Sequence, residues 1–301
     1  MSATATDALL SGLVDYAGLF PPAKLDMGPA LTTYADARRG GDAAMLGRFV
    51  VPAARLGELQ QRRGDQGSAA HPLVLSLLAG PADLAAAAQT VATDRSLVIA
   101  AVEARLPAGA PAAAWLDDLV GAAVRVGLAA IEIYAEAPSP DRDGDLMAAL
   151  GARQAAPGVA RLGAKLRCGG VTPDLVPPVG RVAAVIAAAR DRRVPLKFTA
   201  GLHHPVRGMD RTAGVPMHGF LNVYGAALLA HHAGLAASAL EPVLAETDPA
   251  AFRLDTGGFA WRDLAVPAAV VAHLRGRLLG GYGSCSFAEP VDDLRALSLL
   301  T

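Results

Sequence analysis

Eight short apolar runs, most of them separated by a single helical stretch, dominate this sequence. The runs span residues 16–20, 45–51, 73–78, 96–103, 129–134, 160–168, 194–200 and 278–287. Strands that alternate with helices form right-handed parallel units, and eight such units predict an α/β fold, a closed (β/α)8 or TIM barrel. An open doubly wound sheet is the rival. It is disfavoured because no Gly-x-Gly-x-x-Gly motif follows the first run.

The alternation breaks between residues 202 and 277. We interpret this segment as a long helical insertion between strands seven and eight, on the catalytic face, with helices near 217–234, 238–247 and 265–275. No internal repeat and no low-complexity linker marks a second domain, so residues 1–301 are expected to form one barrel domain.

Composition excludes several classes of function. Hydrophobic residues make up 52% of the chain and charged residues 18%, with a net charge of −1, which gives no basic excess for a nucleic acid. No apolar run reaches the roughly 18 residues of a membrane span, and residues 1–12 lack the pattern of a secretory signal. We therefore expect a cytoplasmic protein that acts on a small molecule and has no membrane partner. In one interpretation the small-molecule substrate is an anion. A homo-oligomer is compatible with this pattern.

Lysine is rare in this chain. Only three of the 27 basic residues are lysines, namely Lys24, Lys165 and Lys197. In a chain biased toward Arg, a Lys is expected where Arg cannot substitute, and Lys, unlike Arg, can serve as an amine nucleophile. The alternative is that these three positions arose by chance.

Polar side chains fall near the carboxyl ends of runs four to seven, where barrel enzymes place their catalytic groups. The candidates are Glu103, Glu132, Tyr134, Lys165, Arg167, Lys197 and Thr199. Strand alternation turns Lys165 and Lys197 inward from adjacent strands. A cation beside a desolvated lysine lowers its pKa, and the free amine can form a Schiff base with a carbonyl compound while Glu103 moves protons. The alternative is an ion-pair network that only ties the strands together.

Two segments, roughly 165–201 and 281–287, resemble the deoxyribose-phosphate aldolase family of class I aldolases. The similar motifs are Lys165-Leu-Arg-Cys-Gly-Gly-Val-Thr-Pro-Asp, Lys197-Phe-Thr-Ala-Gly and Tyr282-Gly-Ser-Cys-Ser. The resemblance implies a barrel lyase without a cofactor, in which Lys165 forms the Schiff base, Lys197 lowers its pKa and Glu103 relays protons. The chain departs from the family in having Glu rather than Asp on strand four, Gly201-Leu-His-His-Pro in place of Gly-Gly, and the long insertion.

The insertion and the last strand supply further candidates for substrate binding. They are His203, His204, His218, Asn222, Ser284 and Ser286, to which we add Lys24. The histidines also allow a second hypothesis, a metal-assisted hydrolase or isomerase. No His-x-His or His-Glu-x-x-His motif occurs, so no metal ligand is assigned. A third hypothesis is a non-catalytic barrel that binds a ligand.

Overall fold

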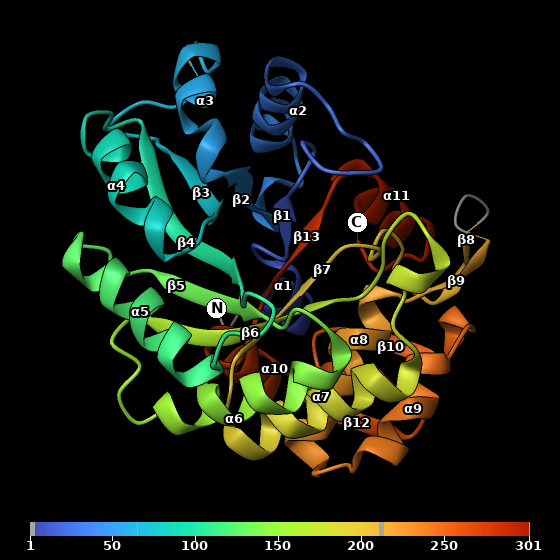
Figure 1. Ribbon diagram of the computed structural model, residues 1–301. Helices are drawn as coiled ribbons and strands as arrows, with labels where there is room; N and C mark the ends of the chain where they lie inside the picture. Colours follow the sequence, from blue (N-terminus) through green and yellow to red (C-terminus); the bar gives the residue numbers. More distant parts are fainter. Residues whose placement is uncertain (1–3, 65, 211–213, 301) are drawn as a thin grey trace.

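A closed barrel of eight parallel strands forms the centre of the computed structural model (Figure 1), which describes residues 4–64, 66–210 and 214–300. Around the barrel the strands follow the order β1-β13-β7-β6-β5-β4-β3-β2, and each neighbouring pair is parallel. The predicted (β/α)8 barrel is therefore confirmed. The barrel strands are β1 (Val14–Tyr16), β2 (Leu46–Pro52), β3 (Leu73–Leu78), β4 (Leu97–Arg105), β5 (Glu132–Glu136), β6 (Arg161–Arg167), β7 (Leu196–Thr199) and β13 (Leu279–Ser284).

Helices cover the outside of the barrel (Figure 1). They are α1 (Ala5–Leu10), α2 (Met27–Arg39), α3 (Leu56–Arg62), α4 (Leu84–Ala92), α5 (Ala112–Arg125), α6 (Asp143–Arg153), α7 (Val179–Arg192), α8 (Phe220–Ala233), α9 (Ala237–Ala245), α10 (Ala268–Arg277) and α11 (Ala288–Ala296). Helix α5 buries one face along its length, which contains Trp115, Leu116, Leu119 and Val120. Residues at this spacing share one helical face, so the sequence pattern directs that face to the barrel.

The first strand begins two residues earlier than predicted. The run at 16–20 reads as a strand from its apolar residues, but β1 covers Val14–Tyr16 and residues 18–23 are mostly turn. The cause is hydrogen bonding between strands, since Val14 and Tyr16 pair with Tyr282 and Ser284 of β13.

The segment between β7 and β13 is only partly helical. Its described residues form α8, α9 and α10, but also a hairpin of β8 (Gly208–Asp210) and β9 (Val215–Met217) and a three-stranded antiparallel sheet of β10 (Phe252–Leu254), β11 (Gly258–Trp261) and β12 (Leu264–Pro267). The expected helix at 265–275 starts only at Ala268, because the preceding residues pair with β11. A turn in which the Asp255 carboxylate accepts a hydrogen bond from the Gly257 N–H connects β10 to β11.

Helix α8 lies against the barrel, with the rest of the segment packed outside it. Phe220 stacks on Tyr282, the ring of Tyr224 meets Phe198 edge-on, and the Tyr224 hydroxyl donates to the Gly280 carbonyl at 2.7 Å. Helix α9 packs on α7 and α8, and β11 and β12 cover α8 and α10. Residues on all sides of α8 are buried for this reason, as expected of a helix that is apolar all round.

No helix in the described ranges is both long and apolar enough to cross a bilayer.

Candidate active site

A cavity of about 600 Å³ opens at the carboxyl ends of the barrel strands. Its floor contains Glu103 and Lys165. Its wall is formed by the loops after β1, β6, β7 and β13, together with the start of α11. The lining residues are Ala17, Phe20, Pro21, Pro22, Ala23, Val50, Leu78, Glu103, Lys165, Arg167, Gly170, Val171, Leu175, Thr199, Ala200, Gly201, His203, His204, Asp210, Met217, Gly283, Ser284, Cys285, Ser286 and Glu289. In barrels this end holds the active site.

Two glycines allow the loops after β6 and β7 to meet at the cavity wall. Gly201 has a φ of +71°, and a Cβ there would lie 2.7 Å from the Cα of Gly169. Any other residue would be strained by that backbone conformation and would also clash. The Gly-rich turns of both motifs thus allow two neighbouring loops to approach closely above the lysines.

Lys165 lies between two carboxylates at the floor of the cavity. Its Nζ is 3.0 Å from Oε2 of Glu103 and 2.9 Å from Oε2 of Glu136, and its side chain is 9% exposed. Burial by itself would lower the pKa of Lys165, but the two carboxylates outweigh it and raise this pKa above its ordinary value. The pKa of Lys165 is therefore raised rather than lowered, because acidic groups are the direct neighbours of the Lys165 ammonium.

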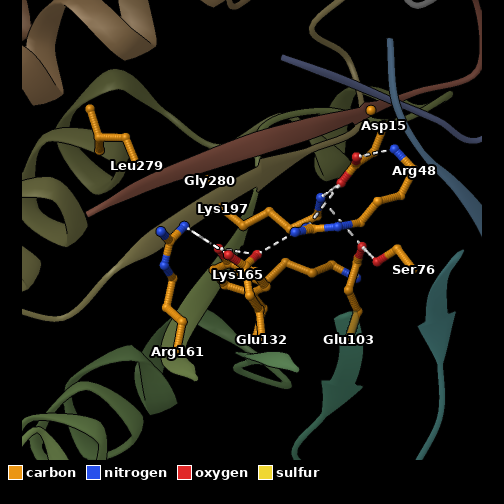
Figure 2. A network of polar contacts seen from close by, with 12 residues as sticks. Asp15, Arg48, Ser76, Glu103, Glu132, Arg161, Lys165, Lys197, Leu279 and Gly280 are labelled. Carbon is orange, nitrogen blue, oxygen red and sulfur yellow. Dashed lines mark hydrogen bonds and ion pairs between the residues drawn. The ribbon is translucent and has the colours of Figure 1, made fainter. Parts of the chain in front are cut away.

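Lys197 lies beside Lys165 in the strand register but is completely buried within the barrel. Its Nζ forms an ion pair with Asp15 of β1 and lies 3.5 Å from Oε1 of Glu103, which also accepts a hydrogen bond from Ser76 at 2.6 Å. Figure 2 shows these groups converging inside the barrel. Burial raises the pKa of Glu103, but Lys165 and Lys197 overcome this effect and lower the pKa to about 2. Glu103 is thus an anion shared by both lysines.

A second set of charges lies among the inner side chains of β2, β5 and β6. Glu132 accepts a hydrogen bond from Arg48 at 2.7 Å and lies 3.1 Å from Arg161 (Figure 2). It also accepts a hydrogen bond from the Tyr134 hydroxyl at 3.1 Å. The backbone N–H of Arg48 also donates to Asp15 at 2.6 Å. None of these side chains lines the cavity. The structure therefore places Glu132 and Tyr134, predicted as substrate-binding residues, in a network beneath it.

Six of the residues predicted to bind substrate do line the cavity. Arg167, Thr199, His203, His204, Ser284 and Ser286 all belong to its wall. Nδ1 of His203 lies 2.9 Å from Glu289, and Nδ1 of His204 lies 2.6 Å from Asp293, so both imidazoles are tied to α11. Ser286 and Ser284 bond locally, since the Ser284 hydroxyl accepts from the Ser286 N–H and the Ser286 hydroxyl accepts from the Glu289 N–H.

Three predicted binding residues lie away from the cavity. Lys24 is exposed, and only its neighbour Ala23 reaches the wall. Asn222 is buried and joins three segments: its amide donates to the carbonyls of Val243 and Glu246, and its oxygen accepts from the Arg207 N–H. His218 is buried and bonds to the Pro177 carbonyl at 2.7 Å.

His218 stabilises the fold as a neutral imidazole. Its Nδ1 faces an Arg207 nitrogen at 3.2 Å, and because Arg only donates, Nδ1 accepts and Nε2 donates to Pro177. Burial, reinforced by Arg207, lowers the pKa of His218 to about 4.

This depressed pKa predicts a loss of stability in mild acid. An unfolded His binds a proton near pH 6.5 and folded His218 only near pH 4, so its contribution is complete above pH 6.5 and is lost as the pH falls toward 4. The expected decrease is about 3 kcal/mol. Urea unfolding at several pH values would show this decrease in the free energy of unfolding in wild type and in the control variant His273→Phe, whose histidine is exposed. The variant His218→Phe should not show it. The same decrease in His218→Phe as in wild type would contradict the assignment of this pH dependence to His218.

Sequence reasoning missed five members of the buried network. They are Asp15, Arg48, Ser76, Glu136 and Arg161. A signal was present for Arg48, Ser76 and Arg161, which lie within apolar runs, whereas Asp15 directly precedes the run at 16–20. Glu136 alternates with Glu132 and Tyr134, but the predicted run stopped at 134. A polar residue at an inward position of a buried strand needs a partner, and that rule would have selected Arg48, Ser76 and Arg161 within the predicted runs.

Among the described residues, no group of three or more His, Cys, Asp or Glu side chains is arranged to hold a metal ion. Comparison of the sequence with models of known protein families and with curated proteins gave no match.

Proposed function

We propose that this protein is a lyase that makes or breaks a carbon–carbon bond in a small carbonyl compound through a Schiff base on Lys165. The observation that carries the proposal is the position of Lys165. Of the described lysines it alone lines the cavity, and it does so between two carboxylates. Lysine amines in barrel mouths form imines with aldehydes and ketones, and the motifs around Lys165 and Lys197 are similar to those of a Schiff-base aldolase family.

The two carboxylates supply the proton transfers that the raised pKa of Lys165 demands. The Lys165 ammonium gives a proton to Glu136 or Glu103, and the free amine adds to the carbonyl carbon. One proton passes from the amine nitrogen to the carbonyl oxygen as the carbinolamine forms. The proton held by the carboxylic acid then adds to the same oxygen, which leaves as water and leaves a protonated imine. In the cleavage direction a carboxylate takes the proton of a hydroxyl on the carbon that is released, and that fragment leaves as an aldehyde or ketone. The electron pair of the broken carbon–carbon bond moves into the imine to give an enamine, which is protonated at carbon and hydrolysed to free Lys165. Glu136 is the better acceptor, because Lys197 and Ser76 already hold Glu103 as an anion.

Reductive trapping tests this proposal. The protein is incubated with a panel of small aldehydes and ketones, borohydride is added, and intact mass and peptide mapping locate the adduct. We expect one adduct per chain, on Lys165, because borohydride reduces an imine to a stable secondary amine. Lys24, which is exposed, serves as an internal control for non-specific modification. Folded protein that yields no adduct on Lys165 with any member of the panel would overturn the proposal.

A further inference from the structure

Among the described residues that line the cavity, Arg167 is a cation with no ion pair to a carboxylate. Lys165 is paired with Glu103, His203 with Glu289 and His204 with Asp293. Asp210, which also lines the wall, is engaged as well. Arg167 makes only one long contact among the described residues, from Nη1 to the Gly169 carbonyl at 3.5 Å. Most of the five N–H donors of its guanidinium are thus free to bind a ligand.

A residue with a hydroxyl group is the register partner of Arg167 on the neighbouring strand. Thr199 of β7 pairs with Arg167 of β6 in the strand register, and both side chains line the cavity. Thr199 lies close to the backbone of Gly283 on its other side, since a Cβ on Gly283 would lie 2.9 Å from the Thr199 hydroxyl. A guanidinium beside a hydroxyl donor is a suitable site for a planar carboxylate, which an arginine can bind through two parallel hydrogen bonds.

The register also sets the distance between this site and the reactive amine. Lys165 and Lys197 form one row across β6 and β7, and Arg167 and Thr199 form the next inward-facing row. Two residues of strand correspond to about 7 Å. A group held by Arg167 and Thr199 is therefore several bonds from a carbonyl carbon attached to Lys165.

We propose that the substrate carries a carboxylate, several bonds from its reactive carbonyl, that Arg167 and Thr199 bind at the rim of the cavity. The inference rests on the proposed function and names its substrate class. One uncompensated positive charge matches a carboxylate better than a phosphate, which carries nearly two negative charges. Neighbouring Glu289 adds to the cost of a dianion. The cavity wall also includes the apolar side chains of Val50, Leu78 and Met217, which suit a short carbon chain.

The anion site can be tested without imine formation. Ligand-observed NMR would compare butanoate with butanamide, which share a carbon skeleton and lack a reactive carbonyl. We expect butanoate to bind at least about tenfold more tightly than butanamide, because hydrogen bonds to a charged group are stronger than those to a neutral group by about the free energy that corresponds to a tenfold change in affinity. Arg167→Gln should remove the preference, and Thr199→Val should reduce it. Arg105→Gln is the matched control, because Arg105 is an exposed arginine at the end of β4 that lines no part of the cavity.

Trapping then links the anion site to Lys165. Borohydride reduction with 4-oxobutanoate should reach half-maximal adduct at a concentration about tenfold lower than with butanal, and Arg167→Gln should abolish this difference. Equal binding of butanoate and butanamide, tighter binding of methyl phosphate, or a preference unchanged in Arg167→Gln would overturn the inference. Arg167-dependent butanoate binding without any adduct on Lys165 would instead reject the imine chemistry and retain the anion site.

Discussion

Replacement of Lys165 by arginine is expected to abolish carbonyl turnover and imine trapping, by at least about a thousandfold. Arginine keeps a cation between Glu103 and Glu136, so both ion pairs have a counterpart in the variant. It cannot lose its proton under ordinary conditions and cannot act as an amine nucleophile. The variant thus separates the charge of Lys165 from its chemistry. Borohydride trapping and any turnover found with the carbonyl panel provide the measurement.

Two further variants control this result. Lys24→Arg makes the same exchange at an exposed lysine outside the cavity and should behave as wild type. Lys165→Met removes both charge and nucleophile, and it should remain folded because Glu103 keeps Lys197 and Ser76 as partners. Full activity in Lys165→Arg would show that the lysine only supplies charge, and the protein would then be better described as a barrel with an electrostatic clamp.

Replacement of Lys197 by methionine is expected to lower the free energy of unfolding by about 3–5 kcal/mol, the usual cost of removing one partner of a buried ion pair. Lys197 is 0% exposed and its partner Asp15 is 2% exposed. Without Lys197, the Asp15 carboxylate is left buried in the barrel with the Arg48 guanidinium 3.9 Å away and a hydrogen bond from the Arg48 backbone N–H at 2.6 Å. Urea unfolding at pH 7.5, followed by circular dichroism, provides the measurement.

A double variant makes the Lys197 prediction independent of whether the single variant folds. Asp15→Asn removes the negative charge and keeps an oxygen that can accept from the Arg48 N–H. The double variant Lys197→Met/Asp15→Asn is therefore expected to be more stable than Lys197→Met alone, and a double-mutant cycle gives the coupling between the two side chains. If the double variant is less stable by the full sum of both single effects, Asp15 and Lys197 do not act as a pair.

Much of the barrel was predictable because its signal is local. Seven of the eight predicted runs overlap their barrel strands by three residues or more, and helices between them repeat apolar residues at helical spacing. The segment 202–277 was less predictable. Helix α8 has almost no amphipathic pattern, because it is buried between the barrel and an outer layer, and the strands β10 to β12 are only three or four residues long.

The candidate site was partly predictable for the same reason. Strand alternation and the parallel arrangement are local rules, and they were enough to select Lys165 and Lys197 as inward-facing residues and Glu103 as a residue at the carboxyl end of its strand. The rules could not distinguish depth within the barrel. They grouped Glu132 and Tyr134 with Lys165, whereas the first two lie in a network that does not reach the cavity. The histidines differed as well, since His203 lines the cavity and His218 is bound to Pro177.

The sequence by itself determined the barrel, the inward direction of the lysines and the glycines that allow two loops to meet. Those properties follow from side-chain alternation and backbone conformation, which depend on residues close together in the chain. Only the tertiary structure decided the charge environment of Lys165. Electrostatic interactions act through space, and the partners of the two lysines, Asp15, Glu103 and Glu136, come from three different strands. The pKa of Lys165 is therefore raised by carboxylates that its own strand does not contain.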